Sequence, residues 1–341
     1  MLRKSLMLFG LLFVTACGGD EASQGSAENC AVAGPVEGRA LRIVTTVAPI
    51  TSLVAQVVGD SGAEIVGLVP EGTNSHTFEP PPSAAEVLES ADVVFMNGLV
   101  LEEPTKDLAA ANASSTATIC ELGTAILPES EWLYDFSFPK EGGKPNPHLW
   151  TNPPMAKSYA EIIRDVLTKI DPVNASTYAA NFDLLADAID RLDDAMRQAT
   201  ETISAERRLL LTYHDAYAYF AKHYDWTVVG AIQPSSFDEP TPKDIAELIE
   251  QVRVRNVPAV FGSEVFPSSV LEQIGKETGA RYIDVLRDDD LPGAPGEPAH
   301  SWQGLMRFNF VTMVEALGGK ADALKSLDLV PAVRDTAFYP Q

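Results

Sequence analysis

Residues 71–103 read EGTNSHTFEPPPSAAEVLESADVVFMNGLVLEE, and this stretch sets the pattern for the whole chain. It places His76 in a polar loop directly after an apolar, strand-like run at 64–69. Three prolines stiffen the exit from the loop, Ser83 is the expected cap of a short helix, and residues 92–97 predict a buried strand. Strand, loop, helix and strand in this order are typical of a parallel α/β sheet.

The composition describes an ordinary globular protein. The chain has 341 residues, which favours two domains over one, and 45% of them are hydrophobic and 21% charged. A net charge of −23 argues against nucleic acid as a partner. The acidic residues are spread along the chain rather than gathered in a tail, so we interpret them as a solvated surface.

The first 17 residues predict a targeting segment rather than part of the fold. Two basic residues precede an apolar run at 5–13, and VTAC at 14–17 resembles the lipobox of bacterial lipoproteins. The apolar run is shorter than the roughly 20 residues of a membrane-spanning helix. We expect Cys17 to be lipidated; the alternative is an ordinary secretory signal with an incidental cysteine. Either interpretation places the mature chain on the outer face of the cytoplasmic membrane or in the periplasm.

Removal of the segment that ends at Cys17 leaves two cysteines, Cys30 and Cys120. Two cysteines in an oxidising compartment favour a disulfide, which would pin the N-terminal tether to the first domain. The count permits this pairing, but it does not establish that the two residues lie close together.

Strand-like and helical segments alternate in the first half of the chain. Strands are predicted at 41–47, 64–69, 92–97 and within 118–126, and helices at 49–59, after Ser83 and from 153 or 154 to 170. This alternation favours a doubly wound parallel sheet.

A long helix is predicted next. Residues 174–205 carry no strand signal, and about 30 residues give a helix of about 45 Å, longer than one small domain needs. We interpret it as a rigid strut between two lobes; the alternative is a long surface helix within a single domain. Its apolar stripe consists of Tyr178, Phe182, Leu185, Ile189 and Leu192.

The alternation then repeats, with strands at 208–212, 227–232, 259–261 and 281–286 and helices at 215–224, 241–255, 267–278 and 302–317. The predicted fold class is therefore α/β, with two lobes that each hold a mainly parallel sheet flanked by helices. The predicted segments are a signal at 1–17, a flexible tether at 18–39, a first lobe at 40–173, the linking helix at 174–205, a second lobe at 206–320 and a C-terminal tail at 321–341.

Four candidate metal ligands are spaced about evenly along the chain. His76, His148, His214 and the run Asp288–Asp290 each stand at a strand end or loop edge, two in each lobe. Ligands of open α/β sheets bind beyond the carboxyl ends of the strands, so a cleft between the lobes could bring all four together. Three imidazoles and one carboxylate suit Zn²⁺ and are acceptable for Mn²⁺. Four ligands close the coordination shell, which suits holding a metal more than activating water on it.

The two other histidines and two carboxylates, Asp215 and Glu264, are not expected to be metal ligands. His223 lies half a turn out of phase with His214 in the same predicted helix and should not reach the same ion. His300, in a Pro/Gly loop, is expected to be a surface or capping residue. Asp215 is expected to be a helix N-cap rather than a partner of a ligand. Glu264 either orients a ligand or is a solvated loop carboxylate.

Five motifs carry a resemblance to the zinc- and manganese-binding lipoproteins that serve bacterial ABC importers. The resemblance spans 41–317 and implies two α/β lobes joined by a long helix, with one metal in the cleft and limited hinge motion. It also implies a lipid-anchored, extracytoplasmic carrier that works with a membrane permease, is monomeric and is not an enzyme. The motifs are NSHTFEPPPSAAEVLESADVVFMNGLVLEE, NPHLWTNP, DPVNASTYAANF, TYHDAYAYFAKHYDW and DDLPG.

By this resemblance, His76, His148 and His214 match three ligand motifs of the family. The family's fourth ligand is an aspartate two residues before a leucine, which selects Asp289 when counted back from Leu291, although Asp288 and Asp290 blur the register. A glutamate at the third position usually implies manganese, so His214 favours zinc. The chain lacks the long His/Asp-rich loop of many zinc members before its second histidine.

The predicted function is capture of Zn²⁺ for an importer, with a Mn²⁺ or Fe²⁺ carrier of the same type as the alternative. A zinc hydrolase that uses three histidines is a second alternative, but no H-E-x-x-H pair is present. An adhesin is a third, and no residue pattern favours it.

Overall fold

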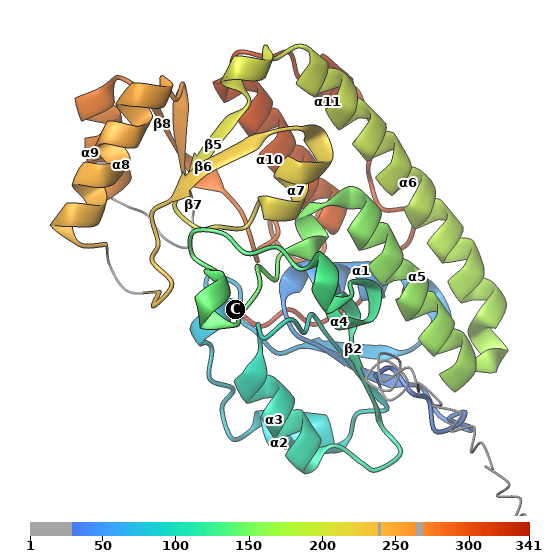
Figure 1. The fold of residues 1–341 in the computed structure, drawn as a ribbon. Coiled ribbons are helices and arrows are strands. Elements are labelled where there is room, and N and C mark those ends of the chain that lie inside the picture. Colours follow the sequence, from blue (N-terminus) through green and yellow to red (C-terminus); the bar gives the residue numbers. More distant parts are fainter. Residues whose placement is uncertain (1–28, 238–239, 264–268) are drawn as a thin grey trace, which may run out of the picture.

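The structure, a computed structural model, describes residues 29–237, 240–263 and 269–341. Two four-stranded parallel sheets flanked by helices make up the fold, so the predicted α/β class is confirmed (Figure 1). The signal that ends at Cys17, residues 18–28 of the tether and Glu264 lie outside the described residues.

The first sheet has the strand order β2-β1-β3-β4, and every pair in it is parallel. Alternate side chains of its central strands point to opposite faces. Val44 and Val94 pack with α2 and α3 in one cluster, whereas Ile43 and Phe95 belong to the larger core that holds α1 and α5. The sheet is therefore covered on both faces. We call it, with its helices, the first lobe: β1 Arg42–Thr45, α1 Ala48–Val58, β2 Glu64–Gly67, α2 Ala84–Glu89, β3 Val93–Met96, α3 Glu103–Asn112, β4 Thr118–Glu121, α4 Leu122–Ile126 and α5 Pro153–Ile170.

The predicted linking helix is α6, Ala175–Glu201, which has 27 residues and a length of about 40 Å. It lies beside α5 along one edge of the molecule and also packs against α1, α10 and α11 (Figure 1). Its predicted apolar stripe is buried from Tyr178 to Leu192. The helix thus contacts helices that flank each of the two sheets.

The second sheet repeats the arrangement, with the strand order β6-β5-β7-β8 and parallel pairs throughout. One of its faces packs with α8 and α9, and the other joins the core around α7 and α10. We call it the second lobe: β5 Leu209–Thr212, α7 Ala218–Tyr224, β6 Thr227–Ala231, α8 Pro242–Arg255, β7 Ala259–Ser263, α9 Ser269–Thr278, β8 Arg281–Leu286 and α10 Trp302–Ala316.

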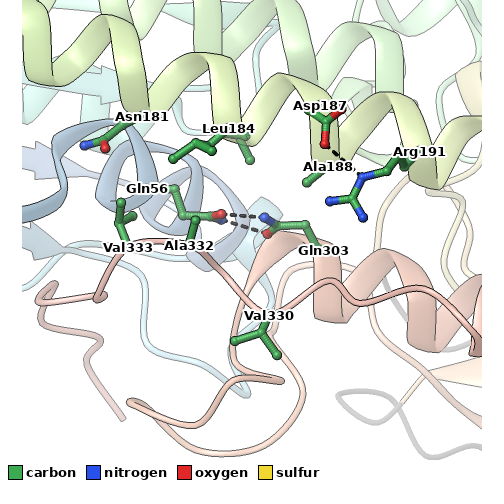
Figure 2. Close-up of a pocket in the computed structure, with 11 residues that line it drawn as sticks. Gln56, Asn181, Leu184, Asp187, Ala188, Arg191, Gln303, Val330, Ala332 and Val333 are labelled. Carbon is green, nitrogen blue, oxygen red and sulfur yellow. Dashed lines mark hydrogen bonds and ion pairs between the residues drawn. The ribbon is translucent and has the colours of Figure 1, made fainter.

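The two lobes share one continuous apolar core, which includes side chains of α1, α6, α7 and α10. At this junction a buried amide pair joins α1 to α10 (Figure 2). Nε2 of Gln56 donates to Oε1 of Gln303 at 2.8 Å, and Nε2 of Gln303 donates to Oε1 of Gln56 at 2.5 Å. The pair borders a small cavity of about 90 Å³.

The predicted C-terminal tail returns to the first lobe. After α11, Asp322–Lys325, it runs back to the edge of the first sheet, where Phe338 forms a parallel bridge with Val66. The amide of the last residue, Gln341, donates to Glu71 at 3.0 Å. Glu71 also accepts from the backbone N–H of Leu291 in the second lobe at 2.9 Å. One carboxylate therefore joins both lobes and the C-terminus.

Two local features bear on the sequence predictions. Cys30 and Cys120 form a disulfide, which ties the tether at Cys30 to β4. The expected cap at Ser83 is wrong: its backbone is already helical (φ −66°, ψ −21°), and its side chain makes no capping hydrogen bond with α2. A capping side chain needs an extended backbone to reach the first free N–H groups.

Candidate metal centre

His76 is presented by a short 3₁₀ turn, Ser75–Thr77, in the loop that follows β2. Asn74 caps this turn, because its Oδ1 accepts from the backbone N–H of His76 at 3.0 Å. The loop is also tied to the second lobe, since the backbone N–H of Gly72 donates to Asp290 at 2.7 Å. His76 is half-buried.

His148 is held by its neighbour Asn146. Oδ1 of Asn146 accepts from the backbone N–H of His148 at 3.1 Å and lies 2.8 Å from its Nδ1. The side-chain amide nitrogen of Asn146 donates to the carbonyl oxygen of Asp215 at 2.7 Å. The partners of this amide therefore fix which of its atoms is the oxygen and which the nitrogen. Because Oδ1 only accepts, Nδ1 of His148 must carry the proton, and Nε2 keeps its lone pair.

His214 follows β5 and is held in the same way by a different side chain. Oε1 of Gln233 lies 2.7 Å from Nδ1 of His214, and both residues are buried. This contact again leaves the lone pair on Nε2.

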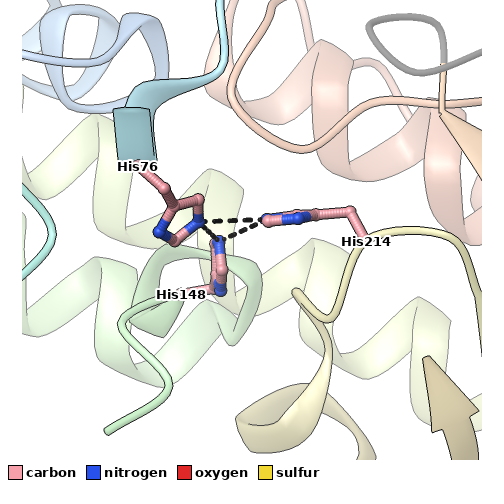
Figure 3. A group of neighbouring side chains, drawn as sticks. All are labelled: His76, His148 and His214. Atoms are coloured by element: carbon pink, nitrogen blue, oxygen red, sulfur yellow. Dashed lines mark hydrogen bonds between the residues drawn. The ribbon is translucent and has the colours of Figure 1, made fainter. Parts of the chain in front are cut away.

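The three Nε2 atoms converge where the lobes meet (Figure 3). They are 3.2 Å apart for His76 and His148, 3.2 Å for His76 and His214, and 2.9 Å for His148 and His214. Nitrogens on a tetrahedral zinc would be separated by about 3.3 Å, given Zn–N bonds of about 2.0–2.1 Å. The spacing therefore fits three corners of a zinc tetrahedron.

Burial keeps the imidazoles of His76 and His148 neutral. It holds the pKa of His76 and of His148 well below the usual value of 6.5, and neighbouring histidines lower both further. Neutral imidazole is the form that binds a metal.

The aspartate run lies close to the histidines but outside their cluster. Ser75, next to His76, donates its hydroxyl to Oδ2 of Asp289, and Oδ1 of Asp289 has no hydrogen-bond partner among the described residues. Burial raises the pKa of all three carboxyls, to about 6 for Asp288 and about 7 for Asp290. In the described part of the chain, the close group of metal-ligating atoms contains only the three histidines.

The expected N-cap at Asp215 is wrong. The helix after His214 begins at Ala218, and Oδ2 of Asp215 instead accepts from the backbone N–H of Ser137 in the other lobe at 3.0 Å. Asp215 is buried beside Asp135, and burial followed by the charge of Asp215 raises the pKa of Asp135 to about 9. This carboxyl pair therefore holds a proton at neutral pH and joins the lobes beside the histidines.

The other two histidines do not belong to the cluster. His223 lies on α7, and its Nε2 is 2.8 Å from Oδ1 of Asp193 on α6. The phase argument that excluded it does not apply, because His214 precedes α7 and is not part of it. The surface position expected for His300 is wrong: it is 2% exposed, packs against Tyr339 and lies 3.8 Å from Glu71. The returning C-terminus covers it.

Sequence reasoning missed Asn146, Gln233 and the aromatic side chains around the histidines. Phe237 stacks on His76 with ring centroids 4.6 Å apart, and Phe138 lies 5.4 Å from the same ring. Asn146 stands within the quoted NPH motif, so a local signal existed for it. Gln233 and Phe237 approach only through tertiary folding.

The chain matches a known family along most of its length. Residues 43–316 match the family described as zinc-uptake complex component A periplasmic, ZnuA. The iron-binding protein YfeA of Yersinia pestis is 29% identical over 277 residues, which cover 81% of this chain and 86% of YfeA. The manganese-binding lipoprotein MntA of Halalkalibacterium halodurans is 28% identical over 287 residues, which cover 82% and 90%.

Solved structures share the fold. The periplasmic zinc-binding protein TroA from Treponema pallidum superimposes with a TM-score of 0.72 at 24% identity, covering 82% of this chain and 99% of TroA. A manganese-bound periplasmic metal-binding protein from Candidatus Liberibacter asiaticus gives 0.70 at 23% identity, with coverage of 82% and 100%. Within the described residues, no helix combines the length and apolar character needed to cross a membrane.

Proposed function

Because the chain belongs to the family of zinc-uptake complex component A periplasmic proteins, we propose that it captures Zn²⁺ outside the cytoplasmic membrane and delivers it to an ABC permease. The family consists of metal-binding components of importers, and the chain is such a component rather than an enzyme. Zinc is here the transported substrate and not a resident cofactor.

The proposal rests on two imidazole nitrogens, Nε2 of His148 and Nε2 of His214, that face each other without protons. With their Nδ1 protons directed to Asn146 and Gln233, His148 and His214 turn two lone pairs toward each other at 2.9 Å. No hydrogen bond can form between two lone pairs, so these two nitrogens repel each other unless a metal cation or a donated proton lies between them. Nε2 of His76 completes a triangle of donors around that position.

Asp289 is the proposed fourth ligand. Ser75 fixes its Oδ2 beside His76, and its Oδ1 is buried without a hydrogen-bond partner among the described residues. Asp290 is committed to Gly72 instead. Oδ1 of Asp288 is also buried without a hydrogen-bond partner among the described residues, but hydrogen bonds from Tyr217 and Ser263 engage the Asp288 carboxylate.

Zinc is favoured because neutral imidazoles outnumber carboxylates in this set. A carrier of Mn²⁺ or Fe²⁺ is the second candidate, since relatives are named for manganese and for iron. The family assignment gives no support to the hydrolase or the adhesin.

The proposed setting follows the N-terminal signal. Lipidation at Cys17 would anchor the chain to the outer face of a bacterial membrane, where the part of the tether between Cys17 and the disulfide at Cys30 would let a monomer reach its permease. Relatives named as lipoproteins support this placement.

Metal content and affinity of the purified chain test the proposal. After stripping, Zn²⁺ and Mn²⁺ are titrated against a competing chelator into wild type and into His76→Ala, His148→Ala and His214→Ala. We expect one tightly bound zinc per chain and a loss of affinity by orders of magnitude in each variant. His223→Ala replaces a histidine of α7 that lies outside the cluster, and this matched control should bind zinc as wild type does. Zinc binding that survives in the three variants would contradict the ligand set.

The fourth ligand needs a separate comparison. Asn replaces Asp at 288, 289 and 290 in turn, which removes the charge and keeps the shape. We expect the largest loss of zinc affinity in Asp289→Asn. A larger loss at either neighbour would move the assignment to that residue.

A further inference from the structure

His76 differs from the other two histidines in how its ring is held. Amide oxygens of Asn146 and Gln233 fix the rings of His148 and His214 through their Nδ1 atoms. No described residue makes a hydrogen bond with Nδ1 of His76, and His76 is the half-buried member of the three. Its orientation must therefore depend on other contacts.

An aromatic ring from the opposite lobe supplies that contact. Phe237, in the segment after β6, stacks on the imidazole of His76 with an interplanar angle of 16° and a centroid separation of 4.6 Å. Phe138 contacts the same imidazole at 5.4 Å and Phe237 at 6.0 Å, both in tilted geometry. Only the Phe237 contact is a parallel stack.

One short segment, 233–237, thus serves two of the three histidines. Its first residue, Gln233, holds His214 within the second lobe, and its last residue, Phe237, reaches His76 in the first. The segment is fixed by a turn in which the backbone N–H of Phe237 donates to the carbonyl oxygen of Pro234 at 2.9 Å. Phe237 has a φ of +59°, which is rare for a bulky side chain and directs the ring at a cost in backbone strain.

We propose that Phe237 is a positioning residue that holds the His76 imidazole with Nε2 toward the metal and slows metal release. The inference rests on the function proposed above. A metal ion on Nε2 withdraws electron density from the imidazole, and an electron-poor ring is attracted more strongly to the face of a phenyl ring. The stack therefore strengthens when metal is bound, and because it spans the lobes, bound metal favours their closure. Separation of the lobes removes Phe237 and frees His76, the ligand nearest to solvent.

Release kinetics of the full chain, purified in detergent and loaded with one Zn²⁺, test this role. A chromophoric chelator in excess reports the rate at which zinc leaves wild type, Phe237→Ala, Phe237→Leu and Phe237→Tyr. An aromatic pair contributes enough for release to become about 3- to 10-fold faster in the Ala and Leu variants. Tyrosine keeps the aromatic face and should restore the wild-type rate. Phe136→Ala is the matched control. It removes a half-exposed phenylalanine two residues before Phe138 and should release zinc as wild type does.

A second readout separates orientation from packing. In the zinc-loaded protein, the ring-current shift of the His76 imidazole protons should lose the contribution of Phe237 in the Leu variant and regain it in the Tyr variant, while the His148 signals stay in place. Equal rescue by Leu and Tyr, or release rates unchanged by Ala, would overturn the role of Phe237 even if zinc binds. Failure of wild type to bind zinc would instead remove the proposed function itself, together with this inference.

Discussion

Replacement of Gln233 by leucine should weaken zinc binding without unfolding the chain. Oε1 of Gln233 lies 2.7 Å from Nδ1 of His214, and the two residues are 3% and 2% exposed. Leucine fills similar space but accepts no hydrogen bond, so the imidazole is free to carry its proton on Nε2, the nitrogen that faces the metal. Loss of such an outer partner costs about 10–100-fold in metal affinity, or about 1.4–2.7 kcal/mol.

Competition between the protein and a chromophoric chelator for Zn²⁺ measures this loss, and thermal unfolding of the stripped protein checks that the variant is folded. Gln233→Glu keeps an acceptor at the same distance and should bind zinc at least as tightly as wild type. Gln273→Leu changes an exposed glutamine on α9 and is the matched control, with no expected effect.

A folded Gln233→Leu variant with zinc affinity within about twofold of wild type would refute the tautomer argument, because the outer-partner effect is at least about tenfold. An equal loss in the Glu and Leu variants would show that the shape of the glutamine matters and its hydrogen bond does not.

Three further predictions concern stability. Burial raises the pKa of Glu102 from 4.5 to about 7. The folded state therefore holds this proton more tightly than the unfolded chain, and the stability it contributes is complete below pH 4.5 and lost as the pH rises through 7. In urea titrations from pH 4.5 to 8, the free energy of unfolding of wild type should fall by up to about 3 kcal/mol relative to that of Glu102→Gln. A difference between the two proteins that does not change with pH would contradict this prediction. Replacing Cys30 and Cys120 by serine opens a link between residues 90 apart and should lower the free energy of unfolding by about 2–5 kcal/mol; an unchanged urea midpoint would count against it. Gln303→Leu leaves the buried amide of Gln56 without this partner and should lower the free energy of unfolding by about 1–3 kcal/mol. Adding Gln56→Leu should restore most of that loss. If the losses of the two single variants simply add, the two amides are not coupled.

The sequence was sufficient to predict features that depend on near neighbours along the chain. Apolar β-branched runs predicted the strands, because a strand buried on both faces needs such side chains at successive positions. The stripe from Tyr178 to Leu192 predicted α6, because residues three and four apart share one helix face. His76, His148 and His214 were singled out because each follows a strand or precedes a helix, and the structure brings all three together.

Two errors of the sequence analysis arose where a distant segment competed with a local signal. Asp215 has the residue type and spacing of an N-cap, yet it binds the backbone of Ser137, 78 positions away. His300 lies in a loop of turn-forming residues, yet Tyr339 covers it.

What only the tertiary structure decided is therefore the layer around the histidines and the contacts between the lobes. Phe237 meets His76 across 161 positions, and Phe338 pairs with Val66 across 272. Such contacts leave no periodic signal in one sequence, because they depend on the angle at which two packed lobes face each other. Local periodicity determined which elements form, whereas the packing of those elements against a shared core determined which side chains hold the site.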